Sequence, residues 1–523
     1  MLCSLSMVGC GRIDFDPLGG SDREVPADSL PASFPDTTDG AAPARWYLKA
    51  SNTDGADLFG TGIEISADGT TLVVSAPGEA SAARGIDGDQ ADDTGASTGA
   101  VYVFVRSGTT WIQQAYLKAS NADAGDAFGE TIALSADGAT LAVGADREAS
   151  AATGVNGNQA SNAAAGAGAV YVFNRSGGVW TQEAYLKASN TGANDWFGNR
   201  IALAGDGATL VVGAPKEDSA ATGINGDQAS NALNAAGAAY VFVRNGGVWT
   251  QQAYLKASNP GSVDDFGEAV TISGDGNTIA LASPLEDSAA TGVNGDQTSN
   301  AAGGAGAVYV FTRTGSVWSQ QAYVKASNAG GGDLFGGSIA LSPDGETLAV
   351  GAWGEASAAT GIDGNQADNT AAMAGSVYVF NRNGGTWAQQ AYLKPSNTGA
   401  NDSFGIGLAF DTLGARLVAS AWFEDSAAVG LDGDGADNSV NAAGAVYVFD
   451  RFGTTWSQTA YVKAYNTGAQ DQFGFGIAVT GDGQLFAVSA PGEASAATGI
   501  DGDQLDDSAG NAGAAYVFTL DDL

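Results

Sequence analysis

The sequence predicts an all-β fold made of one structural unit repeated seven times. The dipeptide Phe-Gly occurs seven times at a constant spacing of 69 residues, first at 59 and last at 473. No sustained 3.6-residue apolar period, which would indicate helices, is found in the chain. Gly makes up 77 of the 523 residues, and Asp-Gly and Ser-Gly turn signals separate short apolar runs. A strict repeat of this kind indicates one array of stacked units rather than several unrelated domains.

Each repeat is expected to form four strands. In the first copy these are expected at residues 62–66, 71–75, 100–105 and 111–118. Asp68-Gly69 joins the first two, because Gly supplies the positive φ that a tight hairpin turn needs. The third strand is rich in β-branched and aromatic residues. The second and third strands are apolar on both faces, as strands buried between neighbouring sheets must be.

The two ends of the repeat region complement each other. Residues 46–51 are expected to form a lone fourth strand, whereas 514–518 form a third strand with no fourth strand after it. The N-terminal strand can therefore complete the last sheet, which closes the array into a ring. An open array would need special capping units at both ends. The prediction is a seven-bladed β-propeller of four-stranded blades over residues 45–523, closed by the N-terminal strand.

Two segments precede the repeats. Residues 1–10 are small and apolar, and Met7-Val8-Gly9-Cys10 is similar to the lipobox of bacterial lipoproteins. The similarity implies lipidation of Cys10 and a place at the cell envelope, as an outer-membrane lipoprotein or as a secreted or surface protein; a chance apolar N-terminus is the alternative. Residues 11–44 hold five scattered prolines and are expected to form a disordered tether. No run reaches the roughly 18 apolar residues of a membrane helix, so membrane contact is expected only through the lipid anchor.

The charge balance excludes some partners. The chain has 58 acids, 21 bases and no His, which gives a net charge of −37. Nucleic acid would need a basic patch, so it is not an expected partner, and charge also opposes docking on anionic lipid. Acidity that merely keeps the surface soluble is the simpler explanation. Both cysteines precede the repeats, so neither disulfides nor Cys metal sites hold the repeats together.

A long loop joins the second and third strands of every repeat, and all seven are expected on one face of the ring. Each long loop carries a Glu, an Asx-Gly-Asx pair and a further Asx. Oxygen side chains at alternate positions, with a Gly for the bend, suit Ca²⁺. The candidate ligands are Glu79, Asp87, Asp89, Asp93, Glu217, Asn225, Asp227, Glu286, Asn294, Asp296, Glu424, Asp432, Asp434, Glu493, Asp501, Asp503 and Asp507. A loop that caps its own backbone is the alternative.

The repeated residues resemble a known family. Phe59-Gly60, Ser75-Ala76-Pro77 and their counterparts are similar to the FG-GAP repeat of bacterial surface proteins and of the integrin α-subunit head. The likeness spans about residues 45–523 and implies a seven-bladed propeller. The integrin-type repeat binds Ca²⁺ between its first and second strands, where this chain has only a short Ser-Ala-Asp-Gly turn. A calcium site here would therefore be a different one, on the opposite face.

Four positions outside the long loops recur in every copy or nearly every copy. A Lys lies in each fourth strand, first at 49, and is expected to form an ion pair with an acid of its own blade. An Asp stands two residues before each Phe, first at 57. The Phe59 and Trp111 series are expected to pack between blades rather than to stack on sugars.

The expected function is that of a non-enzymatic, surface-anchored binding or adhesion protein. It would display its acidic loops, as a monomer, to a protein or glycan ligand that the sequence does not identify. Catalysis needs one constellation of unlike groups, and the chain has no His, no Cys in the repeats and no long loop that departs much from the others. A purely structural envelope or spacer element is the alternative. A propeller hydrolase is less favoured, although the fold alone does not exclude one.

Overall fold

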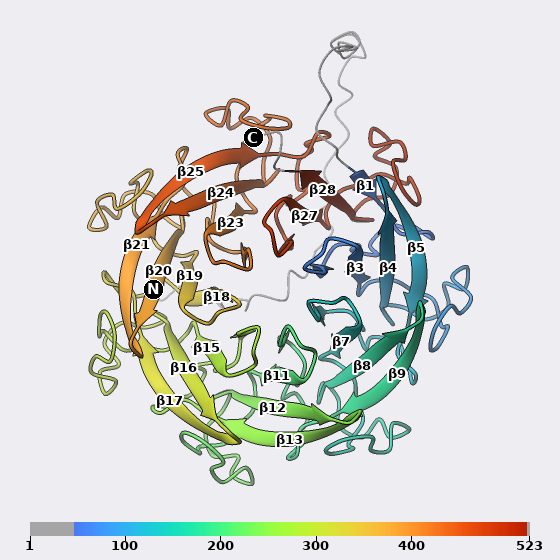
Figure 1. Cartoon of the computed structure of the whole chain (residues 1–523), viewed down its shortest axis with the longest axis horizontal. Helices are drawn as coiled ribbons and strands as arrows, with labels where there is room; N and C mark the ends of the chain where they lie inside the picture. Colours follow the sequence, from blue (N-terminus) through green and yellow to red (C-terminus); the bar gives the residue numbers. More distant parts are fainter. Residues whose placement is uncertain (1–45, 520–523) are drawn as a thin grey trace, which may run out of the picture. The chain divides into compact units, whose positions relative to one another are not determined.

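The computed structural model describes residues 46–519, and this part of the chain forms 28 strands in seven antiparallel four-stranded sheets. Figure 1 shows the sheets as blades around a common axis. Blade 1 contains β2 (Ile63–Ile65), β3 (Thr71–Ala76), β4 (Ala100–Ser107) and β5 (Thr110–Leu117). Blade 2 contains β6 (Thr131–Leu134), β7 (Thr140–Ala145), β8 (Ala169–Ser176) and β9 (Val179–Leu186). The predicted strands are confirmed, with ends that differ by one or two residues.

The remaining blades follow the same plan. Blade 3 contains β10 (Ile201–Leu203), β11 (Thr209–Ala214), β12 (Ala238–Asn245) and β13 (Val248–Leu255). Blade 4 contains β14 (Ala269–Ile272), β15 (Thr278–Ser283), β16 (Ala307–Thr314) and β17 (Val317–Val324). Blade 5 contains β18 (Phe335–Leu341), β19 (Thr347–Ala352), β20 (Ser376–Asn383) and β21 (Thr386–Leu393). Blade 6 contains β22 (Leu408–Phe410), β23 (Arg416–Ala421), β24 (Ala445–Phe452) and β25 (Thr455–Val462).

Blade 7 is completed by the two ends of the repeat region. It contains β26 (Ile477–Val479), β27 (Leu485–Ala490), β28 (Ala514–Thr519) and, as its fourth strand, β1 (Trp46–Leu48). Strand β1 pairs antiparallel with β28, with Trp46 opposite Val517 and Leu48 opposite Ala515. The predicted closure of the ring by the N-terminal strand is therefore confirmed.

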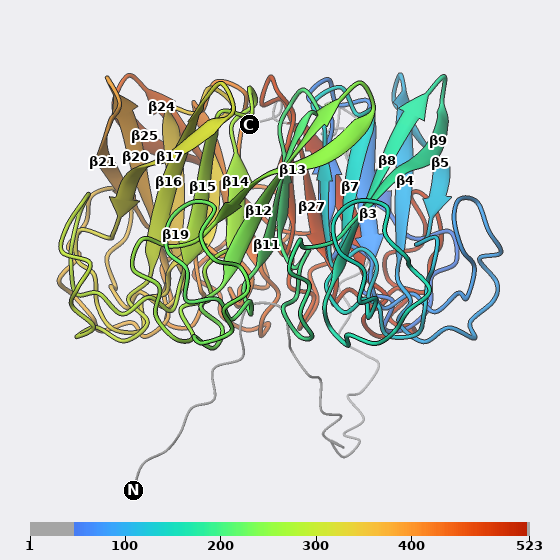
Figure 2. The same ribbon diagram turned by 90° about the horizontal axis from the view of Figure 1, so that it is seen from below.

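The order of strands within a blade runs from the axis outward. The first strands of neighbouring blades contact one another around the whole ring, β2 with β6 and β26, and so on. The fourth strands lie on the outside (Figure 1). Short hairpin turns lie on one side of the ring, and all the long loops lie on the other, which is the lower side of Figure 2. Within residues 46–519, no helix is long and apolar enough to span a membrane.

The hydrophobic core lies between blades. At the junction of blades 7 and 1, Leu48 and Val517 pack in one cluster with Leu72 and Phe104, all of them buried. The ring of Phe59 lies edge-on to Tyr102 in the same cluster, with centroids 5.4 Å apart. Its backbone N–H donates to the carbonyl of Ala512 in the preceding blade. The expectation that this Phe packs between blades is therefore confirmed.

The close contact between the Phe-Gly dipeptide and the preceding blade requires a glycine in that blade. Gly513 has a φ of +81°, and a Cβ on it would lie 2.0 Å from the carbonyl oxygen of Phe59. Neither the positive φ nor the approach would tolerate a side chain. The counterparts Gly99, Gly168, Gly237, Gly306, Gly375 and Gly444 meet the next Phe in the same way. The Phe-Gly dipeptide is therefore half of an inter-blade contact whose other half is a Gly just before the third strand.

Candidate functional site

A buried polar cluster anchors each long loop. In blade 1, the Lys118 ammonium lies 2.6 Å from Glu79 Oε2, and the side chains of both residues are almost fully buried. The Tyr116 hydroxyl donates to Glu79 Oε1 at 2.8 Å. Asn52, from the crossing that enters the blade, donates to the same oxygen at 3.0 Å and accepts from Tyr102. The Glu of the loop is thus fully occupied by its own blade and by the crossing from the preceding one.

This polar cluster is repeated around the ring. The other Lys–Glu pairs are Lys49–Glu493, Lys187–Glu148, Lys256–Glu217, Lys325–Glu286, Lys394–Glu355 and Lys463–Glu424, at 2.7 to 3.3 Å. Each pair joins residues of one blade, so the expectation for these lysines is confirmed. Burial lowers the pKa of Lys118 and of its counterparts, and the neighbouring Glu opposes that shift. A buried pair of this kind holds the loop in place because the loss of either partner would leave an uncompensated charge.

The Asx residues of the long loops cap backbone groups. Asp87 has a φ of +53°, and its Oδ1 accepts the backbone N–H of Tyr116 at 3.0 Å. Asp89 Oδ1 accepts the N–H of Ala91 at 3.0 Å. Both contacts recur in the part of the chain described, with Asn in place of Asp in several copies, as in Asn156 and Asn158. An amide oxygen accepts these hydrogen bonds as well as a carboxylate does, and Asn tolerates the positive φ. This explains the exchange of Asp and Asn.

The predicted calcium ligands are therefore distributed over two layers. The buried layer holds the Glu of the polar cluster, and the exposed layer holds the Asx side chains such as Asp87, Asp89 and Asp93. Between residues 46 and 519, no three His, Cys, Asp or Glu side chains come close enough together to hold a metal ion. The contacts present are those of a self-capped loop, and calcium binding stays a prediction. Cys10 and residues 11–44 lie outside the described residues.

The Asp before each Phe-Gly is buried beneath the loop face. Asp57 is 3% exposed, and its Oδ2 accepts the backbone N–H of Asp54 at 2.9 Å. Burial raises the pKa of Asp57 to about 7, and that hydrogen bond opposes the shift. Six counterparts show the same shift: to about 7 for Asp126, Asp195, Asp264, Asp402 and Asp471, and to about 6 for Asp333.

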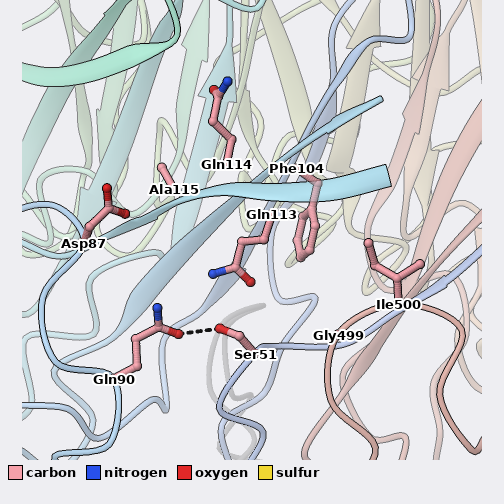
Figure 3. Close-up of a pocket in the computed structure, with 9 residues that line it drawn as sticks. All are labelled: Ser51, Asp87, Gln90, Phe104, Gln113, Gln114, Ala115, Gly499 and Ile500. Atoms are coloured by element: carbon pink, nitrogen blue, oxygen red, sulfur yellow. Dashed lines mark hydrogen bonds between the residues drawn. The ribbon is translucent and has the colours of Figure 1, made fainter. Parts of the chain in front are cut away.

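Hollows occur where blades meet on the outer side of the loop layer. One of about 430 Å³ lies between blades 7 and 1, where Ser51, Gln90 and Gln113 surround it (Figure 3). Ser51 donates to Gln90 across it. A second, of about 260 Å³, lies at the corresponding place in blade 6, where Gly435 stands in the position of Gln90. The two hollows lie at equivalent places of the repeat and hold no group that distinguishes them chemically.

The copies differ most at the inner end of the loop face. Two contacts between consecutive blades define the inner positions. Asp146, the residue after the second strand of blade 2, meets Asn199, two residues before the next first strand (3.1 Å), and Trp422 meets Phe475 at the equivalent place between blades 6 and 7. Lys216, two residues after the second strand of blade 3, meets Asp265, the residue before the next Phe (2.5 Å). We call these residues and their equivalents in the other blades the inner positions, and they lie beside the first strands, which line the axis.

Blades 2 to 4 fill the inner positions with charge. We call Glu130, Asp146, Arg147, Trp196, Asn199, Arg200, Lys216, Asp265 and Glu268 the charged sector. Lys216 lies over the ring of Trp196, 5.3 Å from its centroid. Burial raises the pKa of Glu268 to about 7, against the opposing effect of Arg200. Burial, with Asp146 nearby, raises that of Glu130 to about 7.

Blades 5 to 7 fill the same positions with rings. We call Trp353, Trp422, Phe423 and Phe475 the aromatic sector. Trp422 stacks on Phe475 with centroids 4.1 Å apart, and its indole N–H donates to the carbonyl of Gly474 at 2.7 Å. All four rings are partly exposed. The inner positions thus hold unlike groups that the outer loops lack.

The sequence analysis did not predict these sectors, because the long loops of the seven repeats are alike and the differences lie outside them, at the inner positions. The signal was present in the tripeptide that ends each second strand. Its third residue is Pro in four copies but Asp146, Trp353 and Trp422 in the others. The seven copies are nearly identical elsewhere, so these substitutions indicate that the blades differ in chemistry at this position.

The chain is similar to one repeat family and, at low identity, to solved structures. The FG-GAP repeat family matches residues 111–173, 180–242 and 318–380. No curated protein matches the chain. A structure of a putative 6-phosphogluconolactonase from Bacteroides uniformis is similar, with 13% identity over 77% of this chain and 86% of that one, and a TM-score of 0.44. Kuenenia stuttgartiensis hydrazine synthase has 14% identity over 84% and 93%, with a TM-score of 0.46. The three matched segments are in register with one another along the repeat, and residues 46–519 form a seven-bladed β-propeller that carries these matches to the FG-GAP repeat.

Proposed function

We propose that this protein is a non-enzymatic binding protein of the cell envelope whose acidic loop face captures a cationic partner. The supporting observation is the arrangement of the long loops. Each is anchored by a buried polar cluster, so the exposed acids at Asp87, Asp89 and Asp93 and their counterparts stand on a rigid ring. A preorganised surface loses little conformational entropy when it binds. Its negative field attracts cationic groups from a distance.

The partner would be a protein or glycan that carries amines or guanidinium groups. Attachment through a lipidated Cys10 would present the ring outside the membrane, and that anchor also belongs to the proposal. A structural spacer would need the rigid ring but not its acidic face. A binding protein and a structural spacer can therefore be distinguished by whether the acidic loop face binds a partner.

The test compares two charge-matched variants of the full chain. One replaces six exposed loop acids, Asp87, Asp89, Asp93, Asp501, Asp503 and Asp507, by Asn. The other replaces six exposed acids of the hairpin turns on the opposite side, Asp68, Asp137, Asp206, Asp275, Asp344 and Asp482, by Asn. Asn occupies each of the loop positions in other copies, as at Asn156, Asn158 and Asn162, so the loops should keep their fold.

Binding to immobilised polylysine is measured by biolayer interferometry between low and physiological salt, with polyglutamate as the reference surface. The loop variant is expected to bind at least ~10-fold more weakly than wild type, a loss of about 1.4 kcal/mol. The opposite-side variant should bind as wild type does. Equal losses in both variants would leave only nonspecific attraction to a protein of net charge −37. No binding at physiological salt would favour the spacer.

Calcium can be examined on the same proteins. The Glu of each polar cluster is taken up by Lys and Asn, and in every blade but blade 2 also by Tyr. A cation would therefore have to use the exposed Asx oxygens. A rise in melting temperature with Ca²⁺ that exceeds the rise with Mg²⁺ at matched ionic strength, and that Asp87→Ala/Asp89→Ala reduces, would support binding. Equal effects of the two ions would indicate a self-capped loop.

A further inference from the structure

Blade 7 fills with one of its own side chains a place that the other blades leave open. Tyr465, in the crossing that enters blade 7, stands in the position that Ser51 has in the crossing into blade 1. A Cβ built on Gly430 would lie 2.7 Å from Tyr465 Cε1, so the Tyr ring packs against this glycine. The same ring stacks beside Phe518, with centroids 6.1 Å apart and planes at 28°. A phenol ring therefore lies where blades 6 and 7 meet.

The equivalent place in blade 1 is the hollow of about 430 Å³ between blades 7 and 1. Gly499 and Phe104, which line this hollow, are the counterparts of Gly430 and Phe518. A Cβ on Gly499 would meet no atom of residues 46–519 within 4 Å. The same is true of the other counterparts, Gly85, Gly154, Gly223, Gly292 and Gly361. The position that the Tyr465 ring takes is thus open in the other six blades, whose crossings carry Ser51, Ser120, Ser189, Ser258, Ser327 and Ser396.

A Gln of the fourth strand divides these six places into two groups. In blades 3, 4 and 6 its amide donates to the Ser of the crossing at 3.0 to 3.1 Å, in the pairs Gln251–Ser189, Gln320–Ser258 and Gln458–Ser396. These hydrogen bonds tie the two sides of the hollow together. In blades 1, 2 and 5 that bond is absent among the described residues, and a buried Oε1 accepts no hydrogen bond in Gln113, Gln182 and Gln389.

The lining of the hollow in blade 1 indicates a flat ring that carries a hydroxyl group. Ile500 and Phe104 form an apolar side, and the amides of Gln113 and Gln90 face the hollow from the other side (Figure 3). Most buried polar atoms in native proteins are satisfied, and an O–H group can donate to an amide oxygen that has no donor. A phenol combines an apolar ring with one such hydroxyl. Sites for small ligands commonly pair an apolar wall with a few polar groups.

We propose that the hollow between blades 7 and 1 is a binding site for a phenol ring of the kind that a tyrosine residue carries. The ring would lie against Gly499 and Ile500, as Tyr465 lies against Gly430, and its hydroxyl would donate to Gln113 Oε1. The hollows of blades 2 and 5 meet the same conditions and are equivalent sites. The inference goes beyond the proposed function, because a neutral ring in these hollows needs no acidic face.

The probe is N-acetyltyrosinamide, which carries the tyrosine ring between two amide groups. N-acetylphenylalaninamide lacks the hydroxyl, and methyl β-glucoside is a hydroxylated ring that is not aromatic. Binding to the full chain is measured by saturation-transfer difference NMR at physiological salt. The phenylalanine analogue is expected to bind at least ~5-fold more weakly, because it leaves the Gln oxygen without a donor, and the glucoside at least ~10-fold more weakly.

Equal or tighter binding of the glucoside would overturn the requirement for an aromatic ring. No saturation transfer to N-acetyltyrosinamide at about 10 mM would overturn the site. p-Cresol, which is the ring without peptide groups, identifies the source of the ligand. Tighter binding of N-acetyltyrosinamide than of p-cresol assigns the hollows to a tyrosine residue of a partner protein, and equal binding assigns them to a free phenol.

The variants use the substitution that the chain itself carries at Tyr465, which guards against misfolding. The filled variant, Ser51→Tyr/Ser120→Tyr/Ser327→Tyr, places a ring in the three proposed sites. The matched control, Ser189→Tyr/Ser258→Tyr/Ser396→Tyr, makes the same change in the three hollows that a Gln–Ser hydrogen bond already closes. The filled variant is expected to bind N-acetyltyrosinamide at least ~10-fold more weakly than wild type, and the control to change by less than ~2-fold. Equal changes in the two variants would overturn the assignment.

A second variant tests the hydrogen bond without filling the hollows. Gln113→Leu/Gln182→Leu/Gln389→Leu should still bind the ring but should lose the preference for the tyrosine analogue over the phenylalanine analogue. A preference that survives would overturn the role of these three amides. Ring binding that persists while polylysine binding fails would overturn the proposed function alone. Polylysine binding without ring binding would overturn only the sites in the hollows.

Discussion

At the scale of single residues, the main polar feature of each blade is a buried ion pair between a Lys and a Glu. Two charges brought out of water pay a large desolvation cost, which their attraction offsets only when the geometry is good and the remaining donors and acceptors are satisfied. Glu79 meets this condition, because Lys118, Tyr116 and Asn52 all donate to it. The cluster joins the loop, the outer strand and the crossing from the preceding blade.

Removing one charge of this pair should therefore be costly. Lys118→Met leaves Glu79 buried beside neutral groups, and we expect a loss of about 3–5 kcal/mol in the free energy of unfolding, measured by urea denaturation. Lys118→Met/Glu79→Gln should recover part of the loss, because the amide oxygen still accepts from Tyr116 and Asn52.

The control is Arg84→Ala, which removes an exposed pair. Arg84 lies 3.1 Å from Asp123, with side chains 57% and 43% exposed, and surface pairs of this kind contribute about 0–1 kcal/mol. A Lys118→Met protein as stable as Arg84→Ala would show that the buried pair contributes nothing.

At the scale of elements, one of the shortest strands closes the whole ring. Strand β1 (Trp46–Leu48) supplies the outer strand of blade 7 from the far end of the sequence. Tyr47 and Leu48 are buried, and Tyr47 donates to Glu493 in the polar cluster of that blade. Lys49, just after the strand, completes the cluster by its ion pair with Glu493. Closure of the ring therefore combines backbone pairing, apolar burial and a polar cluster in a few residues.

Deleting residues 45–52 should lower the melting temperature far more than deleting 11–44. The first deletion exposes an edge of β28 and removes several buried side chains, each worth about 1.5–3 kcal/mol. It also leaves Glu493 without its lysine. Calorimetry of the two truncated proteins checks this expectation. Similar melting temperatures would mean that the ring does not depend on the N-terminal strand.

The sequence predicts those parts of the structure that depend on residues shared by all seven copies. Strand positions, the closure and the pairing of the lysines are set by features that every copy shares, such as Phe59 and Lys118, so seven copies reinforced each inference. The partner of Lys118 is Glu79, 39 residues away in the chain, and only the fold places it there. The charged and aromatic sectors depend on residues that the copies do not share. Averaging over the repeats hides such residues, and only the ring shows that Asp146 and Asn199 meet.

At the scale of the whole molecule, the dominant electrostatic feature is buried acid. Seven Asp residues of the Asp57 series lie under the loop face, and burial raises the pKa of each: to about 7 for six of them and to about 6 for Asp333. An unfolded Asp titrates near about 3.9. The folded ring therefore binds more protons than the unfolded chain between these values. These Asp residues therefore lower the stability of the fold as pH rises through that interval, because stability rises with pH only where the unfolded state binds more protons.

We therefore expect the melting temperature to rise when the pH is lowered from about 8 to about 5. The destabilising effect of these Asp residues is absent below about pH 4 and complete above about pH 7. The net charge of −37 gives a trend of the same sign, but salt screens exposed charges over about 8 Å at physiological ionic strength and affects buried ones much less. A slope that persists at high salt thus belongs to the buried groups.

The triple variant Asp195→Asn/Asp264→Asn/Asp402→Asn should flatten this pH dependence by up to about 1.4 kcal/mol per pH unit for each substitution, because an amide cannot ionise and its oxygen still accepts the local backbone N–H. Asp89→Asn, at an exposed loop position, should leave the slope unchanged. A wild-type melting temperature that is flat or falls between pH 8 and pH 5 at high salt would contradict the raised pKa values.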